Sequence, residues 1–357
     1  MQVYYYTYFA IYALETLLGY VVDDEKKRKT LFCLISGAIV ILLIGLRHPS
    51  MGIDLGYLWK DTGYLSSFDV INTYSWSELF EMEGFLNYEK GYVLLNKVIG
   101  TIYDDWQFLL FVCAVLSIAP IFFYIKRKST LPLLSVFILM GLPVFLMSYS
   151  GLRQAIAIAI TVWSVKYIEE KRVIPFILAV LFASTFHKTA LVFLVAYPLY
   201  YVRMNDLWKL VTVLFLPVVF VFKEPLFEVL SKLFKDNAVA NETGAITLFL
   251  VFCAVYIYLI LLNKKFDETQ NGVVNLFYVA CVCQAFGGIF QTAMRVGYYF
   301  MIYLIVALPN TITQNKNKQE YQTNYIIILL AFLIFGLYAI RYSTWEMAYP
   351  YYFFWEW

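Results

Sequence analysis

Runs of about twenty apolar residues recur along the whole chain, and this pattern constrains the fold more than any other feature. Of the 357 residues, 62% are hydrophobic and only 15% are charged, which is too little polar surface for a soluble domain. The runs are continuous rather than alternating, so they predict membrane-spanning helices and not the strands of a barrel. We therefore expect an all-α, polytopic integral membrane protein that forms a single membrane domain over residues 1–357.

Short basic clusters between the apolar runs predict the topology, because Lys and Arg concentrate in cytoplasmic loops. We count about twelve spans, with clusters at Lys26–Lys29, Lys126–Lys128, Lys171–Arg172, Lys264–Lys265 and Lys316–Lys318 on the inside. This count places the N- and C-termini outside, together with external loops at residues 47–105 and 223–243. The basic residues sit in short clusters between the spans, so the net charge of +2 does not indicate a nucleic-acid partner.

The first external loop contains the segment Gly91–Tyr103, in which apolar residues recur at helical spacing. Asn96 and Lys97 lie off the apolar stripe. Such a segment predicts a helix that lies along the membrane interface rather than across it.

Three arginines lie at span ends on the predicted outer side. Arg47 ends a span, Arg153 follows Gly151, and Arg295 follows a glycine-containing turn. Arg153 and Arg295 are expected at the N-termini of inward-running helices, where free N–H groups and the helix dipole favour an anion. Guanidinium groups add paired donors for phosphate, so the three predict a diphosphate site. The alternative is that each arginine snorkels or pairs structurally.

Residues 173–202 lie between two cytoplasmic basic flanks and are too few for two full spans. Two legs of about 15 residues each rise only about 22 Å. The tip near His187 should therefore lie in a water-accessible pocket below the outer interface. His187 could bind a hydroxyl or relay a proton, or it could be a hydrogen-bonded core residue. Lys188 beside it could complement a phosphate.

Two carboxylates and one amide complete the candidate set. Asp54 follows Gly52 and Glu89 precedes Gly91, and either carboxylate could abstract a proton from a hydroxyl. Pairing with an arginine would lower the carboxyl pKa and weaken it as a base, and either acid could simply neutralise an arginine. Gln154 could orient Arg153 or contact a ligand.

An ordered set of short segments resembles the EpsG family, the Wzy-type polysaccharide polymerases. The matching segments are Gly45-Leu46-Arg47, Gly52-Ile53-Asp54 with Tyr57, Tyr88–Tyr92 followed by Leu94-Leu95, Gly151–Ala155, Phe186–Ala190, and Arg295 with Tyr298–Phe300. The resemblance implies a bacterial inner-membrane glycosyltransferase of the GT-C kind. Such an enzyme joins oligosaccharide repeat units carried on undecaprenyl diphosphate, on the outer or periplasmic face, to make O-antigen, capsule or exopolysaccharide.

Under this resemblance, Arg47, Arg153 and Arg295 hold the diphosphate, and Asp54, Glu89 or His187 deprotonates the acceptor. Gln154, Tyr57 and Tyr298 become substrate contacts. No metal or cofactor is expected, because the arginines can neutralise the diphosphate, and no nucleotide sugar is needed. The expected partners are the lipid-linked oligosaccharide, membrane lipid and a chain-length regulator.

Two other functions remain open at this stage. A flippase or exporter of lipid-linked sugars would place charged residues toward the midplane and would contain two related halves, and neither feature is evident. A membrane acyltransferase that uses His187 would need a cytosolic acyl donor, whereas the predicted topology places His187 on the other side.

Overall fold

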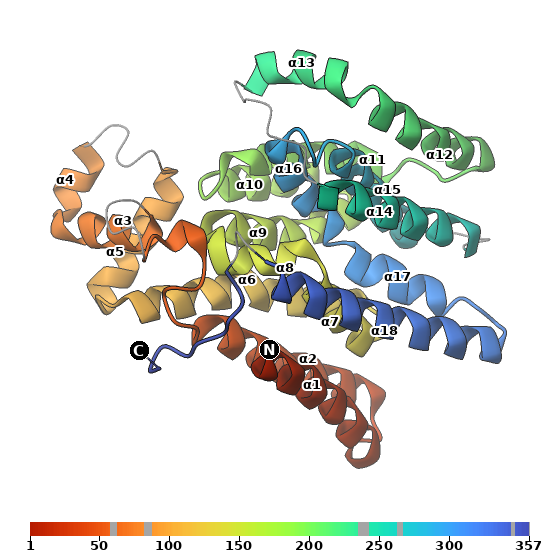
Figure 1. The fold of residues 1–357 in the computed structure, drawn as a ribbon, viewed down its shortest axis with the longest axis horizontal. Coiled ribbons are helices and arrows are strands. Elements are labelled where there is room, and N and C mark those ends of the chain that lie inside the picture. Colours follow the sequence, from red (N-terminus) through yellow and green to blue (C-terminus); the bar gives the residue numbers. More distant parts are fainter. Residues whose placement is uncertain (58–62, 82–87, 235–242, 263–266, 344–346, 357) are drawn as a thin grey trace.

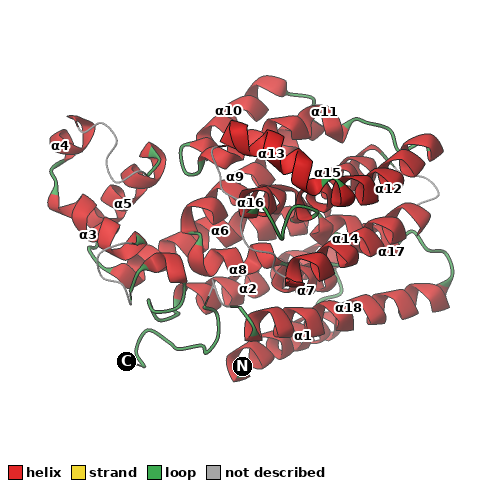
Figure 2. Ribbon diagram, turned by 45° about the horizontal axis from the view of Figure 1, so that its top comes forward, coloured by secondary structure: helices red, strands yellow, loops and turns green. Residues whose placement is uncertain are grey.

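The computed structural model describes residues 1–57, 63–81, 88–234, 243–262, 267–343 and 347–356. Within these ranges the chain forms helices and no strand, as Figure 2 shows. An isolated bridge joins Arg47 to Phe353. The expected all-α class is thus confirmed for the described part of the chain.

Figure 1 shows how the helices follow one another along the chain. In chain order they are α1 (Gln2–Val21), α2 (Glu25–Gly45), η1 (Ile53–Leu55), α3 (Tyr64–Thr73), α4 (Trp76–Glu81), α5 (Lys90–Ile102), α6 (Trp106–Lys128), α7 (Pro132–Gly141), α8 (Pro143–Ser150), α9 (Leu152–Glu169), α10 (Val173–Ser184), η3 (Lys188–Val195), α11 (Ala196–Tyr200), α12 (Asp206–Val221), α13 (Lys223–Phe234), α14 (Thr243–Leu262), α15 (Glu268–Gln284), α16 (Gln291–Met301), α17 (Leu304–Ile312) and α18 (Lys318–Arg341).

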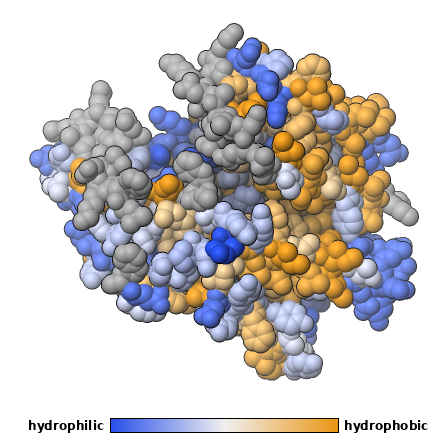
Figure 3. Space-filling model, in the orientation of Figure 1, coloured by the Kyte–Doolittle hydropathy of each residue, from blue (hydrophilic) through white to orange (hydrophobic). Residues whose placement is uncertain are grey.

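Three of the described helices, α2, α6 and α18, are long and apolar enough to cross a membrane. The number rises to six if each sharply bent pair counts as one span: α7 with α8 (61°), α12 with α13 (78°) and α16 with α17 (43°). Several predicted spans are short, such as α10 with 12 residues, so the count of twelve stays a prediction. Figure 3 shows a broad apolar surface that ends in a hydrophilic region at the right-hand edge, where α17 and α18 connect in Figure 1.

The α7–α8 break divides what the sequence predicts as one span from Leu131 to Met147. Pro143 begins α8, and Leu142 before it is extended, with φ −89° and ψ 145°. Proline has no N–H to donate and disfavours a helical conformation in the residue before it. The chain therefore bends at Leu142, and the short helix α8 leads directly to Gly151 and α9.

Helix α9 connects two polar ends of the molecule. Its last residue, Glu169, accepts ion pairs from Arg127 and Lys128 at the end of α6, each at 2.9 Å. Its first turn lies at the opposite end and carries Arg153. Eighteen residues rise about 27 Å, which is close to the thickness of a bilayer's hydrocarbon core. The basic clusters and Arg153 are therefore separated by about one membrane thickness.

The C-terminal segment packs against the end of α2. The His48 amide donates to the Tyr352 carbonyl at 2.8 Å, and the Phe354 amide donates to the Leu46 carbonyl at 3.0 Å. The Tyr4 hydroxyl donates to the Ala348 carbonyl. Both terminal segments thus lie at the same end of the molecule as the motif Gly45–Tyr57.

Helix α5 matches the predicted helix at Gly91–Tyr103, but its polar residues do not face water. Asn96 is fully buried and Lys97 is 8% exposed, whereas Leu94 and Ile102 are 45% and 69% exposed. The Lys97 ammonium donates to the Tyr74 carbonyl at 2.6 Å, after the end of α3. The polar side of α5 is therefore the packed side, and its apolar side is free to contact lipid.

Candidate functional site

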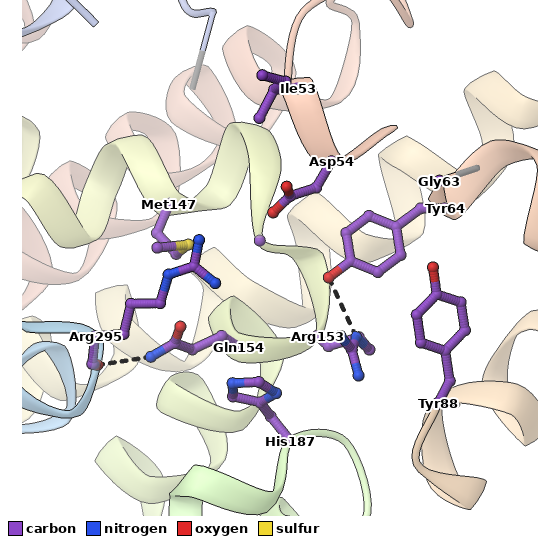
Figure 4. Close-up of a pocket in the computed structure, with 11 residues that line it drawn as sticks. Ile53, Asp54, Gly63, Tyr64, Tyr88, Met147, Arg153, Gln154, His187 and Arg295 are labelled. Atoms are coloured by element: carbon purple, nitrogen blue, oxygen red, sulfur yellow. Dashed lines mark hydrogen bonds between the residues drawn. The ribbon is translucent and has the colours of Figure 1, made fainter. Parts of the chain in front are cut away.

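A polar cavity of about 350 Å³ lies where segments far apart in the sequence meet. It is lined by Ile53, Asp54, Gly63, Tyr64, Tyr88, Met147, Gly151, Arg153, Gln154, His187 and Arg295 (Figure 4). These residues come from η1, α3, the segment before α5, α8, α9, the α10–η3 turn and α16. Five of the sequence-predicted residues are thus brought together: Asp54, Arg153, Gln154, His187 and Arg295.

Arg153 is held from several directions at the start of α9. One of its Nη atoms forms an ion pair with Glu89, and its Nε donates to the Tyr64 hydroxyl at 3.2 Å. Its guanidinium carbon lies 4.5 Å from the centre of the Tyr88 ring, within the range of a cation–π contact. These contacts fix Arg153 with part of its guanidinium directed at the cavity.

Glu89 connects three parts of this end of the molecule. Besides Arg153, its carboxylate accepts a hydrogen bond from the Lys188 amide at 3.0 Å. His187 Nδ1 lies 3.6 Å from Oε1, which is beyond hydrogen-bond distance. Burial raises the pKa of Glu89, but the facing His187, the Lys188 amide and the Arg153 charge outweigh it and lower the pKa to about 2. Glu89 is therefore ionised at neutral pH and is a weak base.

Asp54 projects into the cavity from η1, and Arg295 projects into it from α16 (Figure 4). Among the described residues, no cation forms an ion pair with Asp54 and no carboxylate forms one with Arg295. No group of three or more His, Cys, Asp or Glu side chains in the described ranges could hold a metal ion. The cavity thus offers a ligand one uncommitted carboxylate and one uncommitted guanidinium.

The η1 turn that carries Asp54 fits closely onto the end of α8. The Asp54 amide donates to the Ser150 hydroxyl at 3.1 Å. Gly52 has φ +120°, and a Cβ there would collide with the Tyr149 carbonyl oxygen. Only glycine fits both that conformation and that contact without strain, which explains the glycine two residues before Asp54.

Gln154 positions the element that carries Arg295. Its amide nitrogen donates to the Arg295 carbonyl at 2.7 Å and so joins α9 to α16. The prediction placed Arg295 at a helix N-terminus, but α16 begins at Gln291 and Arg295 lies in its second turn. Arg295 would therefore bind an anion through its guanidinium charge alone, because the free N–H groups of the first turn of α16 do not lie beside it.

A family model described as the EpsG family matches residues 30–353. The chain belongs to the EpsG family. This is the family of Wzy-type polysaccharide polymerases, so the resemblance drawn from the scattered motifs is confirmed. The match includes every residue that lines the cavity. No curated protein and no solved structure matches the chain.

In this EpsG-family chain, Arg47 lies outside the cavity, contrary to the predicted diphosphate contact. Its side chain is fully buried. Its Nε donates to the Met51 carbonyl at 3.2 Å, and one Nη donates to the Tyr149 carbonyl at 3.0 Å. The guanidinium thus joins the segment that follows α2 to the end of α8 through their main-chain carbonyls.

Three further predicted contacts also lie away from the cavity lining. The Tyr57 ring packs against His48 and Trp106, at centroid distances of 5.0 and 6.2 Å. Tyr298, on α16, is buried in the protein core and is 3% exposed. Lys188 approaches Glu89 only with its main-chain amide, and its side chain is exposed. None of the three lines the cavity in this EpsG-family structure.

The sequence reasoning missed the aromatic part of the cavity. Tyr88 belongs to one of the matched segments, and its place beside Glu89 was a usable signal. Tyr64 lies in no matched segment, and only its contact with Arg153 reveals its role. Met147, on α8, lines the cavity as well.

Proposed function

We propose that this cavity is the active site of a glycosyltransferase of the GT-C kind that polymerises oligosaccharide repeat units carried on undecaprenyl diphosphate. Membership of the EpsG family supports the polymerase activity. The observation that carries the assignment of the site is the pair Arg153 and Arg295 on one cavity. Arginines are suited to a diphosphate, because each guanidinium presents paired donors to phosphate oxygens.

In the proposed reaction, an acceptor hydroxyl oxygen forms a bond to the anomeric carbon of the donor sugar. The bond from that carbon to the diphosphate oxygen breaks, and the lipid diphosphate leaves with the electron pair. Arg295 and Arg153 stabilise the negative charge that develops on the leaving oxygen. Asp54 accepts the proton of the acceptor hydroxyl.

Asp54 is preferred to Glu89 as the base because the two carboxylates have different surroundings. Glu89 is engaged by Arg153 and the Lys188 amide, and its pKa is lowered to about 2. Asp54 lines the cavity and has no such ion pair among the described residues. We assign Glu89 the role of positioning Arg153, and His187 the role of binding a sugar hydroxyl.

The proposed site faces the outside of the bacterial inner membrane. The basic residues at the far end of α9 indicate the cytoplasm, because positive charge concentrates there. The cavity lies about one membrane thickness away, at the start of α9. Lipid-linked repeats displayed on the outer leaflet would reach it directly.

A deletion strain complemented with variants tests the proposal. Wild type should restore an electrophoretic ladder of surface polysaccharide, whereas Arg295→Gln and Asp54→Asn should leave single repeats. We expect at least a 100-fold loss of polymer for each variant, because Arg295→Gln removes a donor to a developing charge and Asp54→Asn removes the general base. Arg203→Gln, an exposed arginine outside the cavity, is the matched control and should give a normal ladder.

The membrane side on which single repeats accumulate separates a polymerase from a flippase. A strain without the polymerase keeps single lipid-linked repeats on the outer leaflet, whereas a strain without a flippase keeps them inside. Full-length polymer from both cavity variants at normal membrane abundance would contradict the proposed site. Repeats retained inside would show that the protein acts as a flippase and not as a polymerase.

A further inference from the structure

A second polar cavity, of about 530 Å³, lies at the opposite end of the molecule from the candidate site. Its walls come from α1, α2, α18 and the connection from α6 to α7. Its charged lining comprises the cations Arg28, Lys29, Arg127 and Lys128 and the carboxylates Glu15 and Glu25. The proposed polymerase chemistry uses none of these residues.

Three of the four cations already have partners. Arg127 and Lys128 share the single carboxylate Glu169, each at 2.9 Å. The Lys29 ammonium donates to the Ser129 carbonyl at 2.5 Å and so joins α2 to the α6–α7 connection. One carboxylate therefore serves two cations, and the third cation is held by a neutral oxygen.

Arg28 is the uncommitted cation of this cavity. It is partly buried, and no carboxylate of the described residues lies within ion-pair distance of it. Glu15 lines the same cavity from α1 but acts on Arg28 only through space. A partly buried guanidinium without a bonded partner favours a ligand that supplies anionic oxygens.

Helix α18 carries exposed apolar side chains close to the residue that lines this polar cavity. Tyr325 lines the cavity, and the next residues, Ile326 and Ile327, are 53% and 59% exposed. Since α18 is long and apolar enough to span a membrane, these side chains face lipid. A ligand with a charged head and an apolar chain would match both surfaces at once.

We propose that this cavity binds the phosphate of an anionic phospholipid from the cytoplasmic leaflet. Arg28 and Lys29 contact the phosphate oxygens, and an acyl chain lies along α18. Basic pockets between membrane helices on the cytoplasmic side are suited to such headgroups. The bound lipid would tie α2 to α18, so it would stabilise the folded protein by mass action.

Thermal unfolding of the full-length protein in a zwitterionic detergent tests the inference. Added phosphatidylglycerol should raise the Tm of wild type by several degrees, whereas phosphatidylcholine should not. Arg28→Gln should lose most of this rise. Lys27→Gln removes the same charge from an exposed neighbour outside the cavity, so it should keep the rise.

Two further measurements separate lipid binding from misfolding and from general surface charge. Arg28→Lys should keep at least part of the rise, which would show that the glutamine variant is not simply misfolded. Native mass spectrometry should count fewer bound phosphatidylglycerol molecules on Arg28→Gln than on Lys27→Gln. An equal rise for the two glutamine variants would overturn the proposal in favour of general surface charge. An equal rise with inorganic phosphate alone would overturn it in favour of a free anion.

Discussion

Arg47 and Arg295 have the same residue type and the same predicted role, yet they occupy opposite environments. Arg47 is fully buried and donates to main-chain carbonyls. Arg295 lines the cavity and has no ion pair among the described residues. Substitutions at the two positions should therefore fail in different ways, one in folding and the other in polymer synthesis.

Arg47→Gln should lower the amount of folded protein rather than its intrinsic activity. The change leaves buried carbonyls such as those of Met51 and Tyr149 without donors, at about 1–3 kcal/mol for each unsatisfied group. We expect reduced abundance in the membrane and a Tm several degrees lower in detergent. A variant with wild-type abundance and Tm but no polymer would return Arg47 to the catalytic site.

Glu89→Gln should destabilise the protein by an amount that depends on pH. The folded-state pKa of Glu89 is lowered to about 2, from about 4.3 for a free glutamate. The ionised Glu89 therefore contributes about 3 kcal/mol to the free energy of unfolding. This contribution is fully present above about pH 4.3 and is lost as the pH falls toward 2. The Tm difference between wild type and Glu89→Gln should be largest at pH 6 and should shrink by pH 3. A difference that stays constant over this range would show that the carboxylate charge does not matter.

At the residue scale, the sequence could identify polar groups at span ends but not which of them face a cavity. Arg153 and His187 could be predicted because a charged or polar residue at the end of a span or at the tip of a short hairpin is costly in a membrane protein unless it has a role. Asp54 could be predicted because it follows Gly52 in the loop after the span that ends at Arg47. The burial of Arg47 could not, since it depends on main-chain segments as distant as Tyr149. Tyr64 could not be predicted either, because its role depends on its contact with Arg153, which lies 89 positions later in the chain.

At the scale of elements, the contact between α5 and the α10–η3 turn connects Glu89 to His187. The Gly91 amide donates to the Thr185 carbonyl at 2.9 Å. A Cβ at Gly91 would lie 2.8 Å from that same carbonyl oxygen, which is closer than real Cβ contacts. No side chain fits between the two segments.

Gly91→Ala should therefore separate these elements and impair the site from a distance. We expect polymer synthesis to fall at least tenfold, because small displacements of positioning residues are costly to catalysis. The matched control is Gly19→Ala in α1, where a Cβ would meet nothing within 4 Å. If both alanine variants give the wild-type polysaccharide ladder, the contact is not needed for the site.

Helix ends were harder to predict than helices, because proline acts differently in different places. Pro120 lies inside α6, which continues through it from Trp106 to Lys128. Pro143 instead begins a new helix after a 61° bend. Sequence alone does not show which carbonyls the neighbouring helices satisfy, and that decides whether a proline breaks a helix. The hairpin at residues 173–202 could be predicted, because this segment is too short to form two full membrane spans.

At the scale of the whole molecule, the two polar ends of α9 should lie on opposite sides of the membrane. Single cysteines introduced into a chain that lacks its native ones can report this. Lys27→Cys and Lys316→Cys should react only with reagents that enter the cytoplasm, and Thr73→Cys and Tyr103→Cys should react from outside. All four positions are exposed. Labelling of Thr73→Cys and Lys27→Cys from the same side would overturn the topology.

The packing of the C-terminal segment onto α2 also has a consequence for how this protein is made. The Tyr351 hydroxyl bonds to the Leu43 carbonyl, 308 positions earlier, and Tyr352 and Phe354 pair with His48 and Leu46. At about 5–20 residues per second, translation reaches these partners roughly 15–60 s after Leu43. The segment from Leu43 to His48, at the end of α2, can thus gain these contacts only after residues 351–354 have been made, so a partly translated chain has membrane helices before this end of α2 is held in place.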